Sequence, residues 1–148
     1  MALKLLAPVR GFEARRALKA ARRRADEEIL ATRLPSPRLA WRVAELVSDE
    51  NRADLARSLT DVVQAADERL LPTASPLDRV AVRECRPHLL ALAGRLYDTS
   101  QTVTARGVLL VDHLLVDGNS LLYGHSNPTR LAARAEELFA VLAGNDPV

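Results

Sequence analysis

The sequence predicts an all-α fold, a single-domain bundle of five to six helices that begins with an amphipathic, basic N-terminal helix. Three observations support this prediction. Apolar residues are mostly Leu, Ala and Val, and only 3% of the chain is aromatic, which suits helices because Leu and Ala are strong helix formers. Three Ser-Pro or Asn-Pro pairs mark helix starts, and apolar residues recur behind them at three- and four-residue steps. No alternating apolar and polar run offers a partner strand.

Each predicted helix start places a capping side chain before a proline at the first helical position. The three pairs are Ser36-Pro37, Ser75-Pro76 and Asn127-Pro128. Proline lacks an N–H that would be unpaired there, and the Ser or Asn oxygen accepts from a free backbone amide. Asp78 strengthens the second start because an acid in the first turn favours the positive end of the helix dipole.

The apolar stripes behind these starts have helical period. Their members are Leu39, Val43 and Leu46; Leu55, Leu59, Val62, Val63, Ala66 and Leu70; Leu77, Ala81, Leu89, Leu92 and Leu96; and Leu131, Ala135, Leu138, Phe139 and Leu142. Pro87 should kink or split the third of these helices. Residues 103–118, "VTARGVLLVDHLLVDG", predict a short buried helix that ends at Gly118, and the last helix closes before Gly144.

The length of 148 residues corresponds to one ordinary domain, which we divide into a helical arm over residues 1–34 and a compact bundle over 35–148. Cys85 is the only cysteine, so no internal disulfide can form and a reducing cytoplasm is the expected location. The N-terminal apolar run is too short for a signal peptide. The longest apolar run falls far short of a membrane span, so we expect a soluble protein.

Residues 15–28, "RRALKAARRRADEE", set a run of arginines against a run of acids. Within a predicted helix over residues 9–33, one face holds a narrow apolar stripe of Ala14, Ala17, Leu18, Ala21, Ala25 and Ile29. Charges also pair at helical spacing: Arg22 with Asp26, Arg23 with Glu27, Arg24 with Glu28, and Glu13 with Arg16. These pairs neutralise much of the densest part of the run.

A charge asymmetry remains after this pairing. Residues 1–47 hold 11 basic and 5 acidic groups, a net of +6, while the remainder holds 10 and 14, a net of −4. We therefore expect a non-enzymatic protein that acts through protein contact or self-association of its N-terminal helix. The predicted partner-binding residues are Arg10, Phe12, Arg15, Arg16, Lys19 and Arg23.

The alternative is nucleic-acid association through the same basic face, since phosphate neutralisation needs only clustered cations. Against it, the sequence shows no aromatic platform among the arginines and no recognition helix behind a tight turn. An anionic membrane surface is disfavoured because the apolar face is too rich in alanine to insert strongly.

Residues with chemical potential are few. Glu84 and His88 are four residues apart, but Pro87 lies between them and the spacing differs from that of a di-iron bundle. Cys85 is expected in the core, and His113 lies four residues before Asp117 on the polar side of a buried helix.

The polar connection after Gly118 is a candidate loop site, with Asn119, Tyr123 and His125 as its contact-ready side chains. A small metal-binding or enzymatic bundle around His88, His113 and His125 is the third reading. The sequence contains no chemistry-bearing motif, and we assign no cofactor, no metal ligand and no catalytic residue.

Overall fold

The computed structural model describes residues 2–32, 34–121 and 127–144, and it contains six α-helices. No strand occurs in these ranges, which confirms the predicted all-α bundle. Within the described residues, no helix combines the length and the apolar character that crossing a membrane requires. The chain divides into two compact units, Met1–Val43 and Ala44–Val148.

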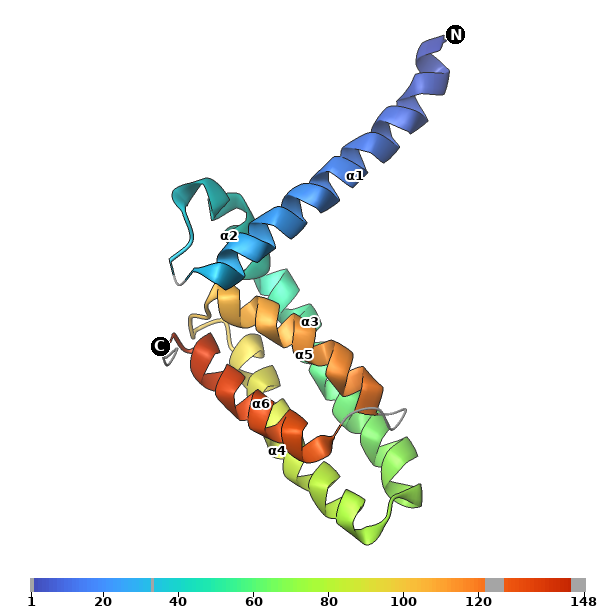
Figure 1. Ribbon diagram of the computed structural model, residues 1–148, viewed down its shortest axis with the longest axis vertical. Helices are drawn as coiled ribbons and strands as arrows, with labels where there is room; N and C mark the ends of the chain where they lie inside the picture. The colour runs from blue at the N-terminus through green and yellow to red at the C-terminus, as the bar shows by residue number, and fades with distance from the viewer. Residues whose placement is uncertain (1, 33, 122–126, 145–148) are drawn as a thin grey trace. The chain divides into compact units, whose positions relative to one another are not determined.

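The first unit consists of α1 (Ala2–Ala31), the 3₁₀ turn η1 (Pro37–Leu39) and the start of α2 (Ala40–Leu46). α1 is one continuous helix, drawn in blue in Figure 1. The predicted start at Ser36 is only partly right. The chain does turn at Pro37, but as a 3₁₀ turn in which the Leu39 amide donates to the Ser36 carbonyl, and the Ser36 side chain makes no capping bond.

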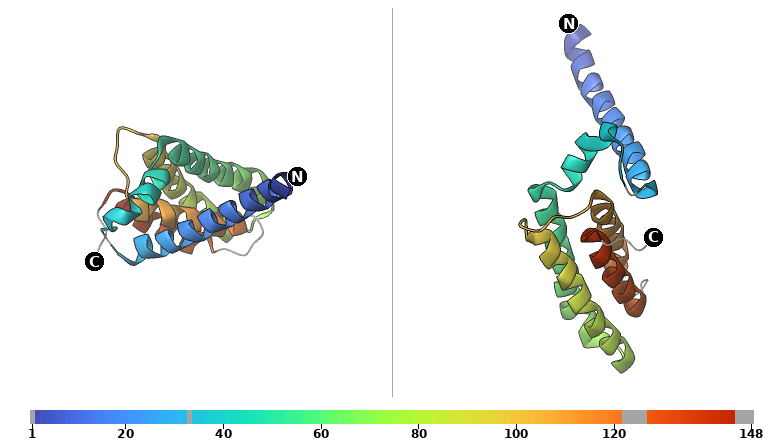
Figure 2. Two further views of the ribbon diagram at one scale, coloured as in Figure 1. Left: turned by 90° about the horizontal axis from the view of Figure 1, so that it is seen from above. Right: turned by 90° about the vertical axis from the view of Figure 1, so that its left-hand side faces the viewer.

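The second unit contains the remaining four helices. Their bounds, with the turns between them, are α3 (Asp49–Ala65), the π turn η2 (Ala66–Leu70), the 3₁₀ turn η3 (Leu71–Thr73), α4 (Pro76–Tyr97), α5 (Ala105–Leu121) and α6 (Pro128–Leu142). α3 and α4 form one antiparallel hairpin, and α5 and α6 form a second hairpin that lies beside it (Figures 1 and 2).

The order of the helices around this four-helix bundle is α3, α4, α6, α5. α4 packs against α3 and α6, while α5 packs against α6 and α3. α4 and α5 follow one another in the chain but lie on a diagonal of the bundle. Residues 98–104 therefore cross one end of the bundle to join the two hairpins.

Two of the predicted caps are confirmed atom by atom. The Ser75 hydroxyl accepts from the Asp78 amide at 3.2 Å, and the Asn127 side chain accepts from the amides of Thr129 and Arg130 at 3.0 and 3.3 Å. Gly144 has φ of 85° directly after the last turn of α6, a conformation that favours glycine, as predicted for that helix end.

Two local predictions are wrong and a third is wrong in part. α4 is not split at Pro87 but runs through it, and both Pro87 and Arg83, whose carbonyl loses its helical partner, are exposed residues. α5 does not end at Gly118 but runs on to Leu121. Leu77 is 84% exposed, since the core side of α4 begins one turn later, at Val82.

The bundle core is built from leucine and valine, with no buried aromatic side chain among the described residues. Its most completely buried members include Leu59, Leu92, Leu96, Val108, Val111, Leu138 and Leu142. α5 and α6 approach closely at Gly107, where an added Cβ would lie 2.9 Å from Leu142 Cα. Thr104 caps α5 there by accepting from the Gly107 amide, and its hydroxyl donates to the Val141 carbonyl at 2.9 Å.

Candidate functional site

Residues 12–23 of α1 present most of the predicted partner-binding residues to solvent. The exposed members are Phe12, Arg15, Arg16, Lys19 and Arg23, while the side chain of Arg10 lies outside the described residues. Phe12, Arg16, Lys19 and Arg23 recur at steps of four, three and four residues and therefore share one face, which we call the basic face. The Arg16 guanidinium lies 5.6 Å from the centre of the Phe12 ring, a cation–π contact.

The opposite side of α1 holds the predicted apolar stripe, and only part of it is covered. Ala25 and Ile29 are buried, at 3% and 1% exposed. Ala14 and Ala17 are exposed and Leu18 is 42% exposed. We call Ala14, Ala17, Leu18 and Ala21 the alanine stripe. Its first three residues have no covering in the described structure.

The acids of the charge run are engaged by residues that follow α1. Arg42 donates two hydrogen bonds to the Asp26 carboxylate, at 2.7 and 3.0 Å, and both side chains are largely buried. Arg38 forms an ion pair with Glu28, the acid for which the sequence predicted Arg24 as partner. Two of the three acids in the run are thus neutralised by arginines that follow α1: Glu28 by Arg38, ten residues later, and Asp26 by Arg42, sixteen residues later.

A cleft of about 230 Å³ lies beside these ion pairs in the first unit. Its lining residues are Ala21, Arg24, Ala25, Glu28, Arg38, Leu39 and Trp41. Trp41 is 41% exposed and shares this cleft with Arg24 and Arg38. The sequence pattern suggested no aromatic platform among the arginines, because Trp41 joins them only through folding.

Arg52 of α3 is the one buried charged residue of the described chain, at 5% exposed. Its guanidinium donates to four backbone carbonyls, those of Leu96 (2.9 Å), Arg95 (3.1 Å), Asp98 (2.7 Å) and Gln101 (2.9 Å). These oxygens belong to the last turn of α4 and to the crossing connection, where the helix dipole is negative. Arg52 therefore ties the end of α4 and the connection to α3. This role is structural.

The Asp98 carboxylate organises the same connection from the outside. It accepts hydrogen bonds from the hydroxyl and the amide of Ser100 and from the Gln101 side chain. The Ser100 hydrogen bonds and then the Gln101 side chain and the Arg52 charge lower the pKa of Asp98 below its ordinary value of 3.8. Arg95 donates to the Gln101 side chain and to the Thr102 carbonyl, so the connection is bonded along most of its length.

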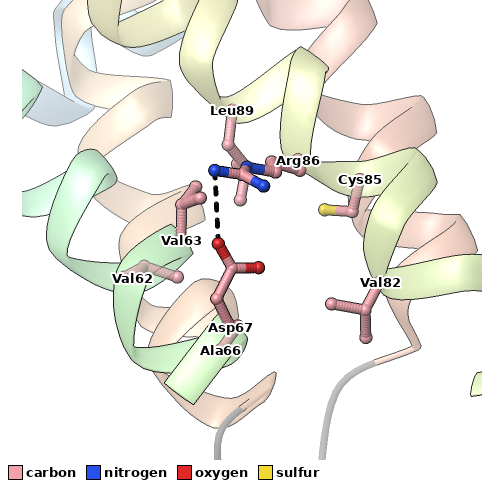
Figure 3. A pocket seen from close by; sticks show the side chains of 8 residues that line it. All are labelled: Val62, Val63, Ala66, Asp67, Val82, Cys85, Arg86 and Leu89. Carbon is pink, nitrogen blue, oxygen red and sulfur yellow. Dashed lines mark ion pairs between the residues drawn. The ribbon is translucent and has the colours of Figure 1, made fainter. Parts of the chain in front are cut away.

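Cys85 lies in a small pocket between α3 and α4, shown in Figure 3. Val62 and Val63 face Val82 and Cys85 across it, and an Asp67–Arg86 ion pair of 3.3 Å lies at its edge. The free space is about 10 Å³, room for one water molecule at most. Burial raises the pKa of the Cys85 thiol to about 11, so it is a poor nucleophile at neutral pH. Cys85 is a core residue.

The remaining candidates do not converge. Asp112 and His113 are exposed on the polar side of α5, while Glu84 is exposed and His88 half-buried on α4. Across the ranges that the structure describes, no group of three or more His, Cys, Asp or Glu side chains could hold a metal ion. In the candidate loop site, Tyr123, His125 and the Asn119 side chain lie outside the described residues.

A surface groove of about 500 Å³, the α3/α4 groove, runs between the outer sides of α3 and α4. Its lining residues are Ala53, Ala56, Arg57, Thr60, Asp61, Leu90, Ala93, Gly94 and Tyr97. Alanine and glycine form its floor, and a Cβ added at Gly94 would meet no atom within 4 Å. Tyr97 is 74% exposed on its wall. Sequence reasoning missed this groove because its small residues belong to two helices and mark neither as unusual.

Comparison with known proteins supplies no relative: no family model, no curated protein and no solved structure matches the chain. The function is therefore argued from these surfaces alone.

Proposed function

We propose that the protein acts through protein–protein contact or self-association, with α1 as its docking helix. The observation that carries this proposal is the exposed half of the alanine stripe. Ala14, Ala17 and Leu18 lie exposed on one side of α1, while the same side of the helix is buried further along, at Ala25 and Ile29. A helix gains most of its stability from packing its apolar face, and this face is unpacked over little more than one turn, from Ala14 to Leu18.

A protein surface suits this stripe better than a membrane does. Alanine offers little apolar area for insertion among lipids, but its small side chain lets another helix approach closely. The basic face lies on the other side of α1, so its cations stay in water when the stripe is covered.

The test is light scattering of the full chain over a range of concentrations. Ala14→Glu places a charge on the stripe, and Ala20→Glu makes the same change on another side of the same helix. We expect the first variant to dissociate the assembly and the second to leave it intact. Equal behaviour of the two variants would refute the role of the stripe.

Nucleic-acid association is the second candidate, supported by the position of Trp41 in a cleft with Arg24 and Arg38. An exposed aromatic ring beside cations can stack on a base of a single strand. Arg38 is already paired with Glu28, which weakens this reading. Titration of a labelled single strand at increasing salt tests it, because phosphate contacts predict a steep fall in affinity. A salt-independent response, or no binding at low salt, would end this candidate.

A further inference from the structure

We propose that the α3/α4 groove binds the alanine stripe of a second copy, so that two chains exchange their α1 helices about a two-fold axis. This inference rests on the proposed function and names the partner and its binding surface. Shape, charge and interface area support it independently.

The shapes match at close range. The floor of the groove carries Ala53, Ala56, Ala93 and Gly94, which hold the surface low between the two helices. The alanine stripe offers small side chains at three of its four positions, and Leu18 is its single larger one. Residues 14–21 and 53–61 are of nearly equal length, about 12 Å of helix each. Leu90 and Tyr97, both exposed on the α4 wall, would be covered by such a helix.

The charges have opposite sign. On the α3 side of the groove, Glu50, Asp54 and Asp61 recur at helical spacing with Arg57 as the one cation between them, and all four are exposed. At the edges of the alanine stripe lie the exposed cations Arg15 and Arg24, with Glu13 as the one acid. The groove itself is lined by one cation, Arg57, and one acid, Asp61, and Arg57 also pairs with Asp54 at 3.7 Å. Together the four side chains keep a net charge of −2 on this side of α3, which attracts the cations of α1 and would repel a nucleic acid.

The interface area that a stable dimer needs favours a reciprocal exchange of α1 helices over a single contact. One short helix in a shallow groove covers too little surface for a stable dimer, which needs roughly 1,200–2,000 Å² in total. Reciprocal insertion doubles the contact, and a two-fold axis makes the two contacts identical. The predicted assembly is thus a dimer in which each chain supplies one α1 and one groove.

The experiment uses full-length chains and sedimentation equilibrium. Ala14→Glu disables the stripe, and Gly94→Leu fills the groove at a position where the added Cβ has open space. The matched controls are Ala20→Glu on α1 and Ala91→Leu, an exposed position on α4 that does not line the groove. We expect each disabling change to raise the dimer dissociation constant at least tenfold, and each control to change it by less than about threefold.

Mixing the two disabled variants is the decisive step. Ala14→Glu retains a working groove and Gly94→Leu retains a working stripe, so a heterodimer keeps one of the two contacts, whereas each variant alone keeps none. We therefore expect the equimolar mixture to associate more tightly than either variant alone but more weakly than the wild-type chain. Circular dichroism of each variant alone checks that both remain helical.

The outcomes separate the two proposals. If Ala14→Glu dissociates the dimer while Gly94→Leu does not, α1 docks elsewhere: the groove assignment is overturned and the proposed function stands. If neither variant changes the dimer, both fail. A wild-type chain that stays monomeric at high concentration, or a mixture that associates no more tightly than either variant alone, also overturns the exchange.

Discussion

Replacing Arg52 by Met should destabilise the bundle more than a substitution at an exposed position or at a helix cap does. The reason is that the guanidinium makes four hydrogen bonds while the residue is only 5% exposed. A hydrogen bond from a charged donor contributes about 1.5–3 kcal/mol. The carbonyls of Asp98 and Gln101 belong to a partly exposed connection and regain water, whereas that of Leu96 belongs to a fully buried residue. We therefore expect a loss of about 3–5 kcal/mol, a large part of the stability of a domain of this size.

The assay is urea unfolding followed by circular dichroism. Arg57→Met is the control, since Arg57 lies on the same helix, is exposed and pairs with Asp54 only at 3.7 Å. It should change the unfolding free energy by no more than about 1 kcal/mol. Arg52→Lys, which keeps the charge but reaches fewer carbonyls, should fall between the two and gives a measurable value if the Met variant does not fold. A loss below about 1 kcal/mol for Arg52→Met would refute the role assigned to this residue.

Three further predictions concern the helix crossing, the thiol and the connection. Gly107→Ala should lower the unfolding free energy by about 1–3 kcal/mol because its Cβ meets backbone at 2.9 Å. Gly94→Ala, which has open space around it, should raise the unfolding free energy by up to about 1 kcal/mol. Thermal unfolding measures both changes, and a change of the same sign in both variants would contradict the close approach at Gly107. Cys85, with its pKa raised from 9.0 to about 11, should have about 100-fold less thiolate than an ordinary cysteine at neutral pH. It should therefore react with a disulfide reagent only as the chain unfolds. Fast reaction of the folded chain would show that the thiol is accessible. Asp98 has a lowered pKa in the folded chain, so its carboxylate adds stability above the pKa of the unfolded state, and this stability is lost as the pH falls through the folded-state pKa. The difference in unfolding free energy between the wild-type chain and Asp98→Asn should therefore shrink on acidification. A difference that stays constant with pH would argue against the lowered pKa.

The parts of the fold that depend on near neighbours in the chain could be predicted from the sequence. Ser75 and Asn127 cap the helices behind them because their partners are two or three residues away. The helical period of the leucines also gave the core side of α4 correctly from Leu89 to Leu96. Leu77 continues the same pattern but is exposed, since the period says which side a residue takes and not how far a neighbouring helix extends.

The parts that depend on distant neighbours could not be predicted. The role of Arg52 has no sequence signature, because the carbonyls that bind it lie 43–49 residues away and belong to the backbone. The pairing of Asp26 with Arg42 was missed for the same reason, since an arginine four residues away satisfied the local rule. The partner of α1 stays a prediction, because a stripe of alanines tells which side docks but not what it docks on.

The diagonal placement of α4 and α5 bears on the order in which the second unit assembles. Each hairpin closes contacts between neighbours in the chain and can form early, as local contacts do. Residues 98–104 span the end of the bundle only after the hairpins have met, and the Asp98 and Gln101 carbonyls that Arg52 binds belong to this connection. We therefore expect the Arg52 hydrogen bonds to α4 to form with the first hairpin and those to the connection to form later, once the two hairpins pack together.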